Sequence, residues 1–181
     1  AIELCKKFDI KHEIVSIEPM LSPYLKNMEE NSLRIGNFSA RLRMSVLYDI
    51  SARENSLVVG TSNKSELLLG YGTIFGDLAC AINPIGDIYK SDLFELAKYL
   101  GVNDSIVKKA PSADFYEGQS DEADLGYSYS KIDSLLKKMI DENRSKDELL
   151  ALGFEDEFIE TIKKRVKINE FKRRLPIVAK I

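Results

Sequence analysis

The chain has 181 residues, of which 44% are hydrophobic and 30% charged, a mixture typical of a globular domain rather than of a disordered chain. Its 26 Lys and Arg residues against 29 Asp and Glu residues give a net charge of −3, which excludes a general nucleic-acid binder because such proteins need an excess of cations. The longest uncharged runs fall short of the roughly 18 apolar residues that cross a bilayer. Two cysteines and one histidine allow neither a disulfide framework nor a multi-histidine metal site, so the composition indicates a cytoplasmic domain with no membrane or nucleic-acid partner.

The first segment, residues 1–8, has the apolar spacing of the last turns of a helix. It begins without an initiator Met or a helix cap, so we expect a chain that is incomplete at its N-terminus; the alternative is a mature N-terminus that happens to be helical. Residues 12–17 alternate and are β-branched, which predicts a strand. Residues 18–36 contain two prolines and a glycine and predict a loop with about one helical turn.

A helix, a strand and a second helix are predicted next. Helical periodicity runs over residues 37–53. Residues 56–60 form a short apolar segment, as in a strand buried in a parallel sheet. Asn63 and Glu66 have the spacing of a capping box and predict a helix over residues 63–69.

The second half of the chain is predicted to be mainly helical. Ser91 is expected to cap a helix that Gly101 closes. Residues 110–127 have no apolar period and hold five acids without a base, which predicts a loop. Helices are predicted over residues 128–139 and 155–173. Because predicted strands alternate with predicted helices, we expect an α/β domain with a parallel sheet.

Polar residues follow the predicted strand at residues 56–60. Thr61 and Ser62 lie where that strand ends and a helix begins, and in an open parallel sheet this edge binds ligands while free helix N–H groups favour an anion. Glu66 lies one turn inside the helix, where its carboxylate can face a metal-bound phosphate. The alternative is that Glu66 only completes the capping box.

Three basic residues are further candidates for binding an anion. Lys90 directly precedes a predicted helix and can reach a phosphate as a point charge. Arg41 and Arg43 project in different directions from the first turns of their predicted helix and suit phosphate or carboxylate groups, although surface ion pairs are a commoner role for such residues. The acids of residues 110–127 indicate either a functional loop that excludes water or a solvated surface.

Several strings, in the same order along nearly the whole chain, resemble the ammonia-dependent NAD synthetase family. They are residues 36–44 (GNFSARLRM), 60–66 (GTSNKSE), 76–79 (GDLA), 83–85 (NPI), Lys90, 111–114 (PSAD), 119–127 (QSDEADLGY) and 172–176 (KRRLP). The resemblance implies a Rossmann-like parallel sheet flanked by helices, of the adenine nucleotide alpha-hydrolase-like kind, in one synthetase domain over residues 1–181. It also implies a homodimer.

The activity implied by the resemblance is that of a NAD(+) synthase, a ligase that adenylates the carboxylate of deamido-NAD with ATP, releases pyrophosphate and lets ammonia displace AMP. This reaction is the final step of NAD biosynthesis. The implied site residues are Thr61, Lys90 and Ser112 for ATP, Glu66 for Mg²⁺, and Arg41 and Lys172 for deamido-NAD. No residue is assigned a catalytic role.

The chain departs from the family pattern in two respects. Ile74, Ala81 and Phe171 stand where some relatives have substrate-binding Lys, Asp and His residues. The family's phosphate loop, Ser-Gly-Gly-x-Asp-Ser, is absent from the 181 residues, so we expect the chain to be the C-terminal two-thirds of a synthetase and to be inactive alone. The alternatives are a non-catalytic or interaction protein that retains the fold, or another ATP pyrophosphatase.

Overall fold

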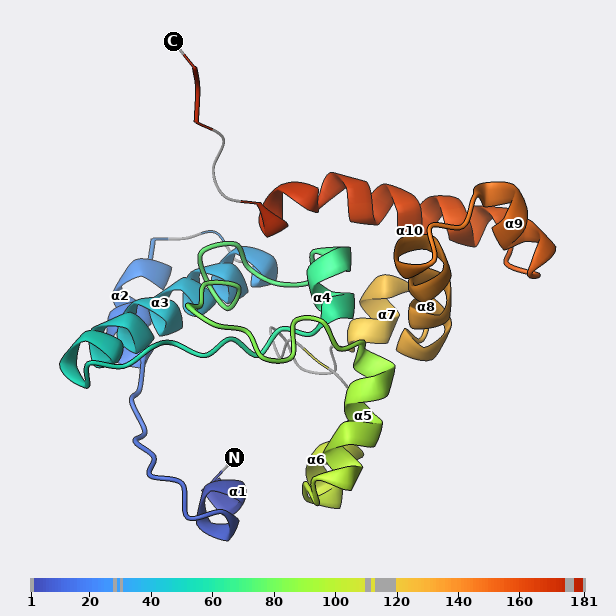
Figure 1. Cartoon of the computed structure of the whole chain (residues 1–181). Coiled ribbons are helices and arrows are strands. Elements are labelled where there is room, and N and C mark those ends of the chain that lie inside the picture. The colour runs from blue at the N-terminus through green and yellow to red at the C-terminus, as the bar shows by residue number, and fades with distance from the viewer. Residues whose placement is uncertain are drawn as a thin grey trace.

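The computed structural model describes residues 2–27, 29, 31–109, 112, 120–174 and 178–180, and helices dominate them (Figure 1). The α-helices are α1 (Ile2–Lys7), α2 (Glu18–Leu25), α3 (Ser32–Arg53), α4 (Lys64–Leu69), α5 (Lys90–Tyr99), α6 (Asp104–Val107), α7 (Asp121–Leu125), α8 (Tyr129–Leu136), α9 (Lys146–Ala151) and α10 (Asp156–Ile168). A π-helix, Lys137–Asp141, continues α8, and a 3-10 helix, Glu170–Arg173, follows α10.

The predicted parallel sheet is not formed by the described residues. Their single β-bridge is the parallel pair Val59 and Ile82, in which the Gly60 N–H donates to the Ile82 carbonyl at 2.7 Å. Residues 12–17 belong to no strand and are almost all exposed. A strand needs a hydrogen-bonded neighbour along its length. Residues 12–17 have none, which corrects the first strand prediction, and the strand predicted at 56–60 is reduced to this bridge.

The segment at residues 18–36, predicted as a loop, is largely helical. Pro19 lies in the first turn of α2, where the missing N–H of proline has no intrahelical partner to lose. Helix α3 begins at Ser32, earlier than predicted, because the Asn31 side chain accepts the Arg34 N–H at 3.0 Å and caps the helix. Pro19 in the first turn of α2, Pro23 accommodated inside that helix and the early cap at Asn31 thus explain this error.

Helix α4 forms as the sequence predicts. The Asn63 side chain accepts the Glu66 N–H at 3.0 Å, and the Glu66 carboxylate accepts the Asn63 N–H at 3.0 Å, so the capping box is complete. Gly70 ends the helix with a φ of 66°. A side chain at Gly70 would be strained and would also overlap Asn169.

The later helices agree with the predictions in place but differ at their ends. Tyr89, and not Ser91, is the N-cap residue of α5, so the predicted cap is wrong, whereas Gly101 has the expected positive φ of 70°. The helix predicted over 155–173 is divided at Asn169 into α10 and the 3-10 helix. Helices α6, α7 and α9 were not predicted, because each is six residues or fewer and too short to show a period.

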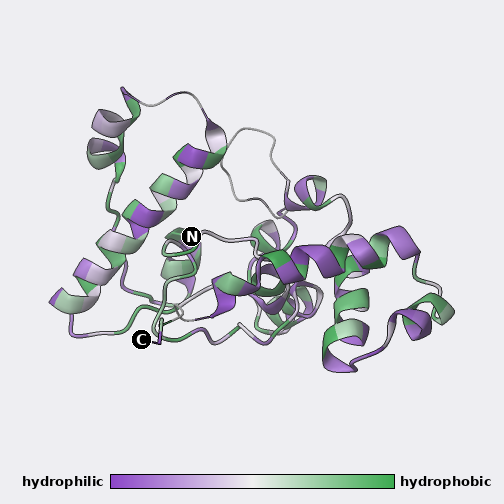
Figure 2. Ribbon diagram, turned by 90° about the horizontal axis from the view of Figure 1, so that it is seen from above, coloured by the Kyte–Doolittle hydropathy of each residue, from purple (hydrophilic) through white to green (hydrophobic). Residues whose placement is uncertain are grey.

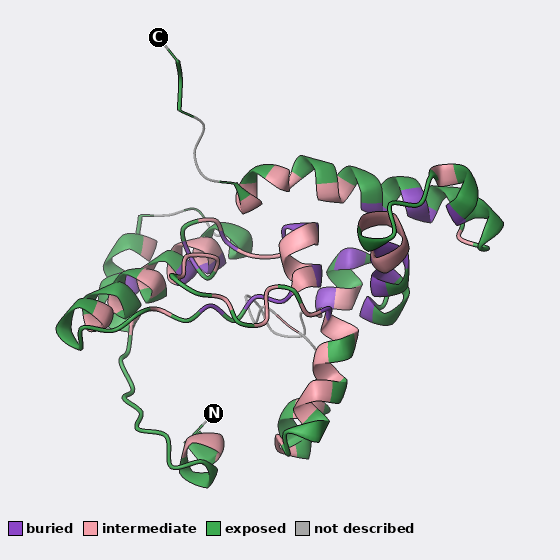
Figure 3. Ribbon diagram, viewed as in Figure 1, coloured by how far each residue is buried: buried purple, intermediate pink, exposed green. Residues whose placement is uncertain are grey.

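Most of the buried core lies in the C-terminal half, and Figure 3 shows buried segments on α7, α8 and α10 as well as on α4. Its residues are Leu69, Tyr89, Leu125, Tyr129, Ile132, Leu135, Leu136, Leu149, Phe158, Ile159 and Ile162. Apolar residues recur three and four positions apart on α8 and α10, which gives each helix one apolar face against the other elements. The colouring of α10 in Figure 2 shows the alternation of its hydrophobic and hydrophilic residues.

Helix α4 lies at the centre of the molecule (Figure 1). It contacts α5, α8, α10 and the 3-10 helix, while α3 packs with α2 away from that group. Among the described helices, none has both the length and the apolar character of a membrane span. The central position of α4 matters because the residues at its two ends line a large cavity.

Candidate functional site

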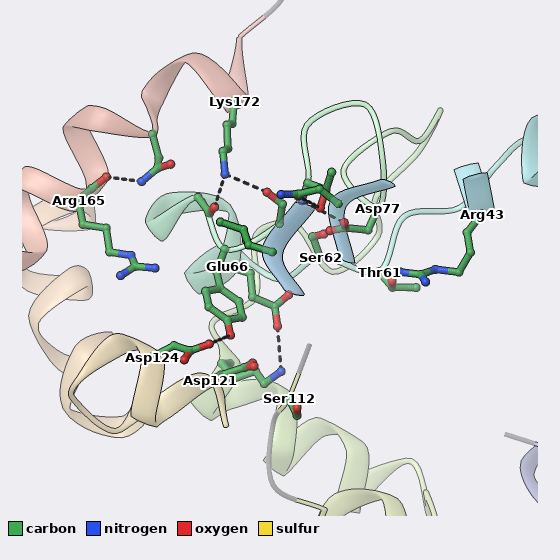
Figure 4. Close-up of a pocket in the computed structure, with 18 of the residues that line it drawn as sticks. Arg43, Thr61, Ser62, Glu66, Asp77, Ser112, Asp121, Asp124, Arg165 and Lys172 are labelled. Atoms are coloured by element: carbon green, nitrogen blue, oxygen red, sulfur yellow. Dashed lines mark hydrogen bonds and ion pairs between the residues drawn. The ribbon is translucent and has the colours of Figure 1, made fainter. Parts of the chain in front are cut away.

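A cavity of about 800 Å³ lies beside α4 (Figure 4). Its walls come from α3, from both ends of α4, from the glycine-rich turn after α4, from α5 and α7, and from the end of α10 and the tail that follows it. Basic side chains on the wall are Arg43, Lys90, Lys109, Arg165 and Lys172, and acidic ones are Glu66, Asp77, Asp121 and Asp124. A mixed wall with several cations suits a ligand that carries phosphates and one or more metal ions.

Five of the six site residues predicted from the sequence line this cavity. They are Thr61, Glu66, Lys90, Ser112 and Lys172. The sixth, Arg41, is exposed, and its Nε donates to the Ile74 carbonyl at 3.3 Å. Arg43, two residues further along α3, lines the cavity instead. The structure therefore brings together residues that are up to 111 positions apart, from Thr61 to Lys172 (172 − 61).

Glu66 and Lys90 form the central ion pair of the cavity. The Lys90 Nζ lies 2.9 Å from one Glu66 carboxylate oxygen, and the two side chains are only 17% and 15% exposed. The other Glu66 oxygen accepts the Asn63 N–H of the capping box. The two interpretations of Glu66 therefore coincide, because one carboxylate caps α4 and also faces the cavity.

Three cations from α10 and the tail hold the carbonyl end of α4. The Lys172 Nζ donates to the carbonyls of Gly70 at 2.7 Å and Gly72 at 2.9 Å. Arg173 donates to the Leu67 and Leu68 carbonyls at 3.1 and 2.8 Å, and the Arg165 Nε donates to the Leu69 carbonyl at 3.3 Å. Burial lowers the pKa of the Lys172 ammonium. These cations satisfy the last carbonyls of the helix and offset its dipole.

The opposite side of the cavity holds Asp121, Asp124 and Tyr71, and the buried Tyr129 contacts Asp121 without lining the cavity. The Tyr71 hydroxyl donates to Asp124 at 2.9 Å, and the Tyr129 hydroxyl donates to Asp121 at 3.3 Å. Asp121 is 4% exposed, and its second carboxylate oxygen is buried without a hydrogen-bond partner. Burial raises the pKa of the Asp121 carboxyl and of both tyrosine hydroxyls. Figure 4 shows Asp121 and Asp124 on the same side of the cavity as Ser112.

The glycine-rich turn is tied to α3. The Asp77 carboxylate accepts the Thr73 N–H at 3.0 Å, and the Thr73 hydroxyl donates to the Asn37 side chain at 2.7 Å. Asn37, Thr73 and Asp77 all line the cavity. This chain of hydrogen bonds sets the distance between α3, which carries Arg43, and the turn after α4.

The sequence analysis did not single out Arg43 over Arg41, or Tyr71, Asp121 and Asp124 as cavity residues. Asp121 and Asp124 lie within the string that resembles the family, and their spacing of three places them on one face of a helix. That spacing was the signal available in the sequence. Of the five acids in the predicted loop, Asp114 and Glu117 lie outside the described residues, so the water-excluding role of that loop stays a prediction.

The cavity fits a magnesium ion that is carried largely by phosphates. The described residues contain no group of three or more His, Cys, Asp or Glu side chains arranged to hold a metal. Mg²⁺ is commonly bound through one or two carboxylates together with substrate phosphates and water. Glu66 is a partly buried carboxylate on the wall, and a carboxylate has lone pairs beyond those its two present partners use. Glu66 can therefore be one ligand in such a set.

Comparison with known proteins agrees with this geometry. The family model described as NAD synthase matches residues 1–176. The NH(3)-dependent NAD(+) synthetase of Wolinella succinogenes is 52% identical over 182 residues, which cover 100% of this chain and 71% of that protein. The protein of the same name from Campylobacter jejuni is 51% identical and is covered over 72% of its length.

Two solved structures resemble the fold. A structure of NMN synthetase from Francisella tularensis has a TM-score of 0.85 and 34% identity, with 99% of this chain and 71% of that chain covered. The NH3-dependent NAD synthetase from Campylobacter jejuni, in complex with the nitrate ion, has a TM-score of 0.81 and 44% identity, with 99% and 70% covered. The match over almost the whole sequence and the shared fold mean that the chain belongs to the NAD synthase family.

Proposed function

We propose that this chain carries the nucleotide-binding part of an ammonia-dependent NAD synthetase, a ligase that makes the amide of NAD from deamido-NAD, ATP and ammonia. The observation that carries the proposal is the convergence of Thr61, Glu66, Lys90, Ser112 and Lys172 on one cavity. These residues were selected from sequence strings alone, and they come from four separate parts of the chain.

The reaction requires the cavity to manage negative charge. The carboxylate of deamido-NAD attacks the α-phosphorus of ATP, forms an acyl adenylate and releases pyrophosphate; ammonia then attacks the acyl carbon, AMP leaves and the nitrogen loses a proton. Negative charge builds on phosphate oxygens in the first step, and positioned cations stabilise it. We assign Lys90 and Ser112 to the ATP phosphates and Thr61 to ATP. Mg²⁺, held in part by Glu66, supplies Lewis-acid shielding of the phosphate oxygens when it is bound.

We assign Lys172 to deamido-NAD as a residue that can change partners. Its ammonium rests on two backbone carbonyls at the rim of the cavity, and these are weaker partners than a phosphate or carboxylate group. Arg41 stays a proposal of the same kind, although Arg43 is the arginine on the cavity wall. Arg41→Ala and Arg43→Ala, each assayed for the KM of deamido-NAD, distinguish the roles of the two arginines.

The test is product formation by a protein in which a Ser-Gly-Gly-x-Asp-Ser segment precedes this chain. We expect one NAD, one AMP and one pyrophosphate for each ATP consumed, with NAD rather than NMN as the product. Lys90→Ala should remove most of the activity, whereas Lys98→Ala, at an exposed lysine of α5 that is paired with Glu95, should be a neutral control. Hydrolysis of ATP without amide formation would reject the proposal and favour another ATP pyrophosphatase.

We also propose that the chain forms one domain that dimerises through α3 in the cytoplasm. Leu33, Leu47 and Tyr48 of α3 are 63%, 51% and 39% exposed, and a helix that packs on one surface needs only one apolar stripe. Isologous dimers are the commonest oligomers. Both cysteines, Cys5 and Cys80, are free thiols, in keeping with a reducing compartment.

Light scattering at micromolar concentration tests the dimer. We expect the mass of two chains for the parent and the mass of one chain for Leu47→Glu. Leu152→Glu changes a leucine of similar exposure, 56%, at the other end of the molecule and should leave the mass unchanged. A parent mass of one chain that does not change on dilution would contradict the dimer.

We also propose that the predicted parallel sheet forms in the protein that carries the phosphate-loop segment. The bridge between Val59 and Ile82 is parallel, and we propose that residues 56–60 extend it when further strands lie alongside. Amide hydrogen exchange should then show slower exchange at Val58 and Val59 in the protein with the phosphate-loop segment than in the 181-residue chain. Equal exchange rates would contradict the sheet.

A further inference from the structure

A buried aspartate that does not line the cavity links the two segments that carry Glu66 and Lys90, the central ion pair of the cavity. Asp133 lies on α8, is 1% exposed, and does not belong to the cavity wall. A buried carboxylate is costly unless its oxygens accept hydrogen bonds. The partners that Asp133 has taken are therefore informative.

Each oxygen of the Asp133 carboxylate accepts one short hydrogen bond from a different helix. The Ser65 hydroxyl of α4 donates to one oxygen at 2.6 Å, and the Ser91 N–H of α5 donates to the other at 2.8 Å. The Ser65 oxygen in turn accepts the Lys90 N–H at 2.9 Å. One carboxylate of α8 thus connects directly to α4 and α5 and reaches the backbone of Lys90 through Ser65.

These contacts replace a helix cap. Tyr89, the N-cap residue of α5, provides no side-chain hydrogen bond, so the first N–H groups of α5 need acceptors from elsewhere. Ser65 and Asp133 supply them. An anion in the cavity therefore meets the ammonium of Lys90 and not these two N–H groups.

The network also determines where the ion pair lies. Ser65 directly precedes Glu66, and Lys90 is the first residue of α5. Fixing Ser65 against the start of α5 holds the backbones of Glu66 and Lys90 at the separation that allows their side chains to meet at 2.9 Å. In metal sites, partners that orient a ligand in this way commonly change affinity or activity roughly 10- to 100-fold when removed.

We propose that Asp133 is a positioning residue that acts through Ser65 and the start of α5 to hold Lys90 and Glu66 in register at the cavity. For turnover this inference rests on the proposed function, because Lys90 and Glu66 matter to rate only if the cavity binds ATP with its metal. The ion pair itself is independent of that function and can be measured directly.

The direct measurement is the acetylation rate of Lys90 by a low dose of acetic anhydride, followed by mass spectrometry and divided by the rate of exposed Lys163 in the same molecule. The amine reacts only after it leaves Glu66 and loses a proton. Asp133→Asn and Ser65→Ala should each raise the ratio roughly fivefold, as expected for the loss of one hydrogen bond to a charged network. Asp147→Asn, an exposed aspartate of α9, is the matched control and should leave the ratio unchanged.

Circular dichroism establishes that each variant is folded. If Asp133→Asn unfolds, Ser65→Ala decides the result, because it keeps the buried carboxylate and removes only the hydroxyl that joins it to Lys90. An unchanged ratio in a folded Ser65→Ala or Asp133→Asn protein would overturn the proposal.

The kinetic measurement uses the protein that also carries the phosphate-loop segment. Both variants should raise the KM for ATP and the Mg²⁺ concentration for half-maximal rate, by roughly 10-fold or more, with the KM for ammonia unchanged. A purely structural role would lower the amount of active protein and leave these constants at the parental values, which would overturn the positioning role. A parent protein that makes no NAD would reject the proposed function, while the acetylation ratio would still decide the role of Asp133.

Discussion

The N-terminal region, residues 2–53, and the C-terminal region, residues 120–173, are both helical but are packed very differently. In residues 2–53 the buried residues within the described chain are Leu21, Gly36 and Ala40. In residues 120–173 the helices α7, α8, α9 and α10 bury eleven residues, and most of the hydrophobic core is among them. The 22 residues of α3 form a long helix with little buried surface, while the 13 residues of α10 bury a continuous face.

This difference shows that helix formation and packing are separate problems. Helix α3 forms because Asn31 caps it and its 22 residues contain no proline, whereas Leu33 and Leu47 of this helix stay exposed. Helix α10 is stabilised by burial of Phe158, Ile159 and Ile162 in the hydrophobic core. Burial of apolar surface supplies most of the free energy of folding, so we expect the stability of the chain to reside in the C-terminal region.

The largest expected effect comes from the core of the C-terminal region. Phe158 is fully buried and contacts the Tyr127 and Phe154 rings, so Phe158→Ala should lower the free energy of unfolding by about 4 kcal/mol. Ile14→Ala, at a residue of the N-terminal region that lies outside α3 and is 76% exposed, should change it by less than about 0.5 kcal/mol. Urea unfolding of the 181-residue chain measures both. A loss at Ile14 as large as that at Phe158 would mean that this part of the N-terminal region is covered in solution and would remove the contrast between the regions.

The second effect concerns Glu66, which caps α4 and lines the cavity. Glu66→Gln keeps a capping-box side chain but removes the charge that faces Lys90. In the protein with the phosphate-loop segment, kcat should fall by about two orders of magnitude, equivalent to roughly 3 kcal/mol in the transition state. Glu157→Gln, an exposed glutamate of α10, is the control. A parental kcat for Glu66→Gln at saturating Mg²⁺ would leave Glu66 as a helix cap only.

The third effect tests whether the end of α10 stabilises α4. Arg173 donates to three backbone carbonyls, those of Leu67, Leu68 and Val166. Arg173→Met should lower the free energy of unfolding by about 2 kcal/mol because buried carbonyls lose a charged donor. Arg174→Met is the control, because Arg174 is next in the chain but is exposed and paired with Glu170. Thermal unfolding measures both variants, and Arg174→Met should have little effect. Equal losses would show that general tail charge, and not the hydrogen bonds of Arg173, is responsible.

The smallest effect concerns the buried carboxyl of Asp121, whose pKa is raised chiefly by burial. Between the ordinary carboxyl pKa, about 4, and the raised value, the folded protein binds more protons than the unfolded chain, so stability falls as pH rises. Asp121→Asn should remove this fall and stabilise the protein at pH 7 by roughly 1 kcal/mol. Thermal unfolding from pH 4 to pH 7 checks it against Asp147→Asn.

Parallel curves of stability against pH for the parent and for Asp121→Asn would contradict the raised pKa. A variant that is less stable than the parent at every pH would show instead that the ionised carboxylate has partners that favour it. Either outcome would mean that the folded protein satisfies the ionised Asp121 carboxylate.

Local sequence patterns correctly predicted the parts of the fold that depend on near neighbours. The capping box of α4 needs only Asn63 and Glu66, three residues apart, and the closing turn after α5 needs only Gly101. Five of the predicted site residues line the cavity: helix starts indicated Thr61, Glu66 and Lys90, and the resemblance to a known family added Ser112 and Lys172. The capping-box spacing of Ser145 and Glu148, which marks the start of α9, was missed because the six residues of this helix are too few to show an apolar period beside it.

The sequence by itself determined where most of the long helices lie, since capping and apolar periodicity act over four to seven residues of the same chain. Only the tertiary structure decided which predicted strand forms a bridge, which of Arg41 and Arg43 lies on the cavity wall, and that Glu66, Lys90 and Asp133 form one network. A strand is stabilised by hydrogen bonds to a distant segment, and the ionisation of a buried carboxyl such as Asp121 depends on what surrounds it in space. These quantities depend on contacts between residues dozens of positions apart, which local patterns do not encode.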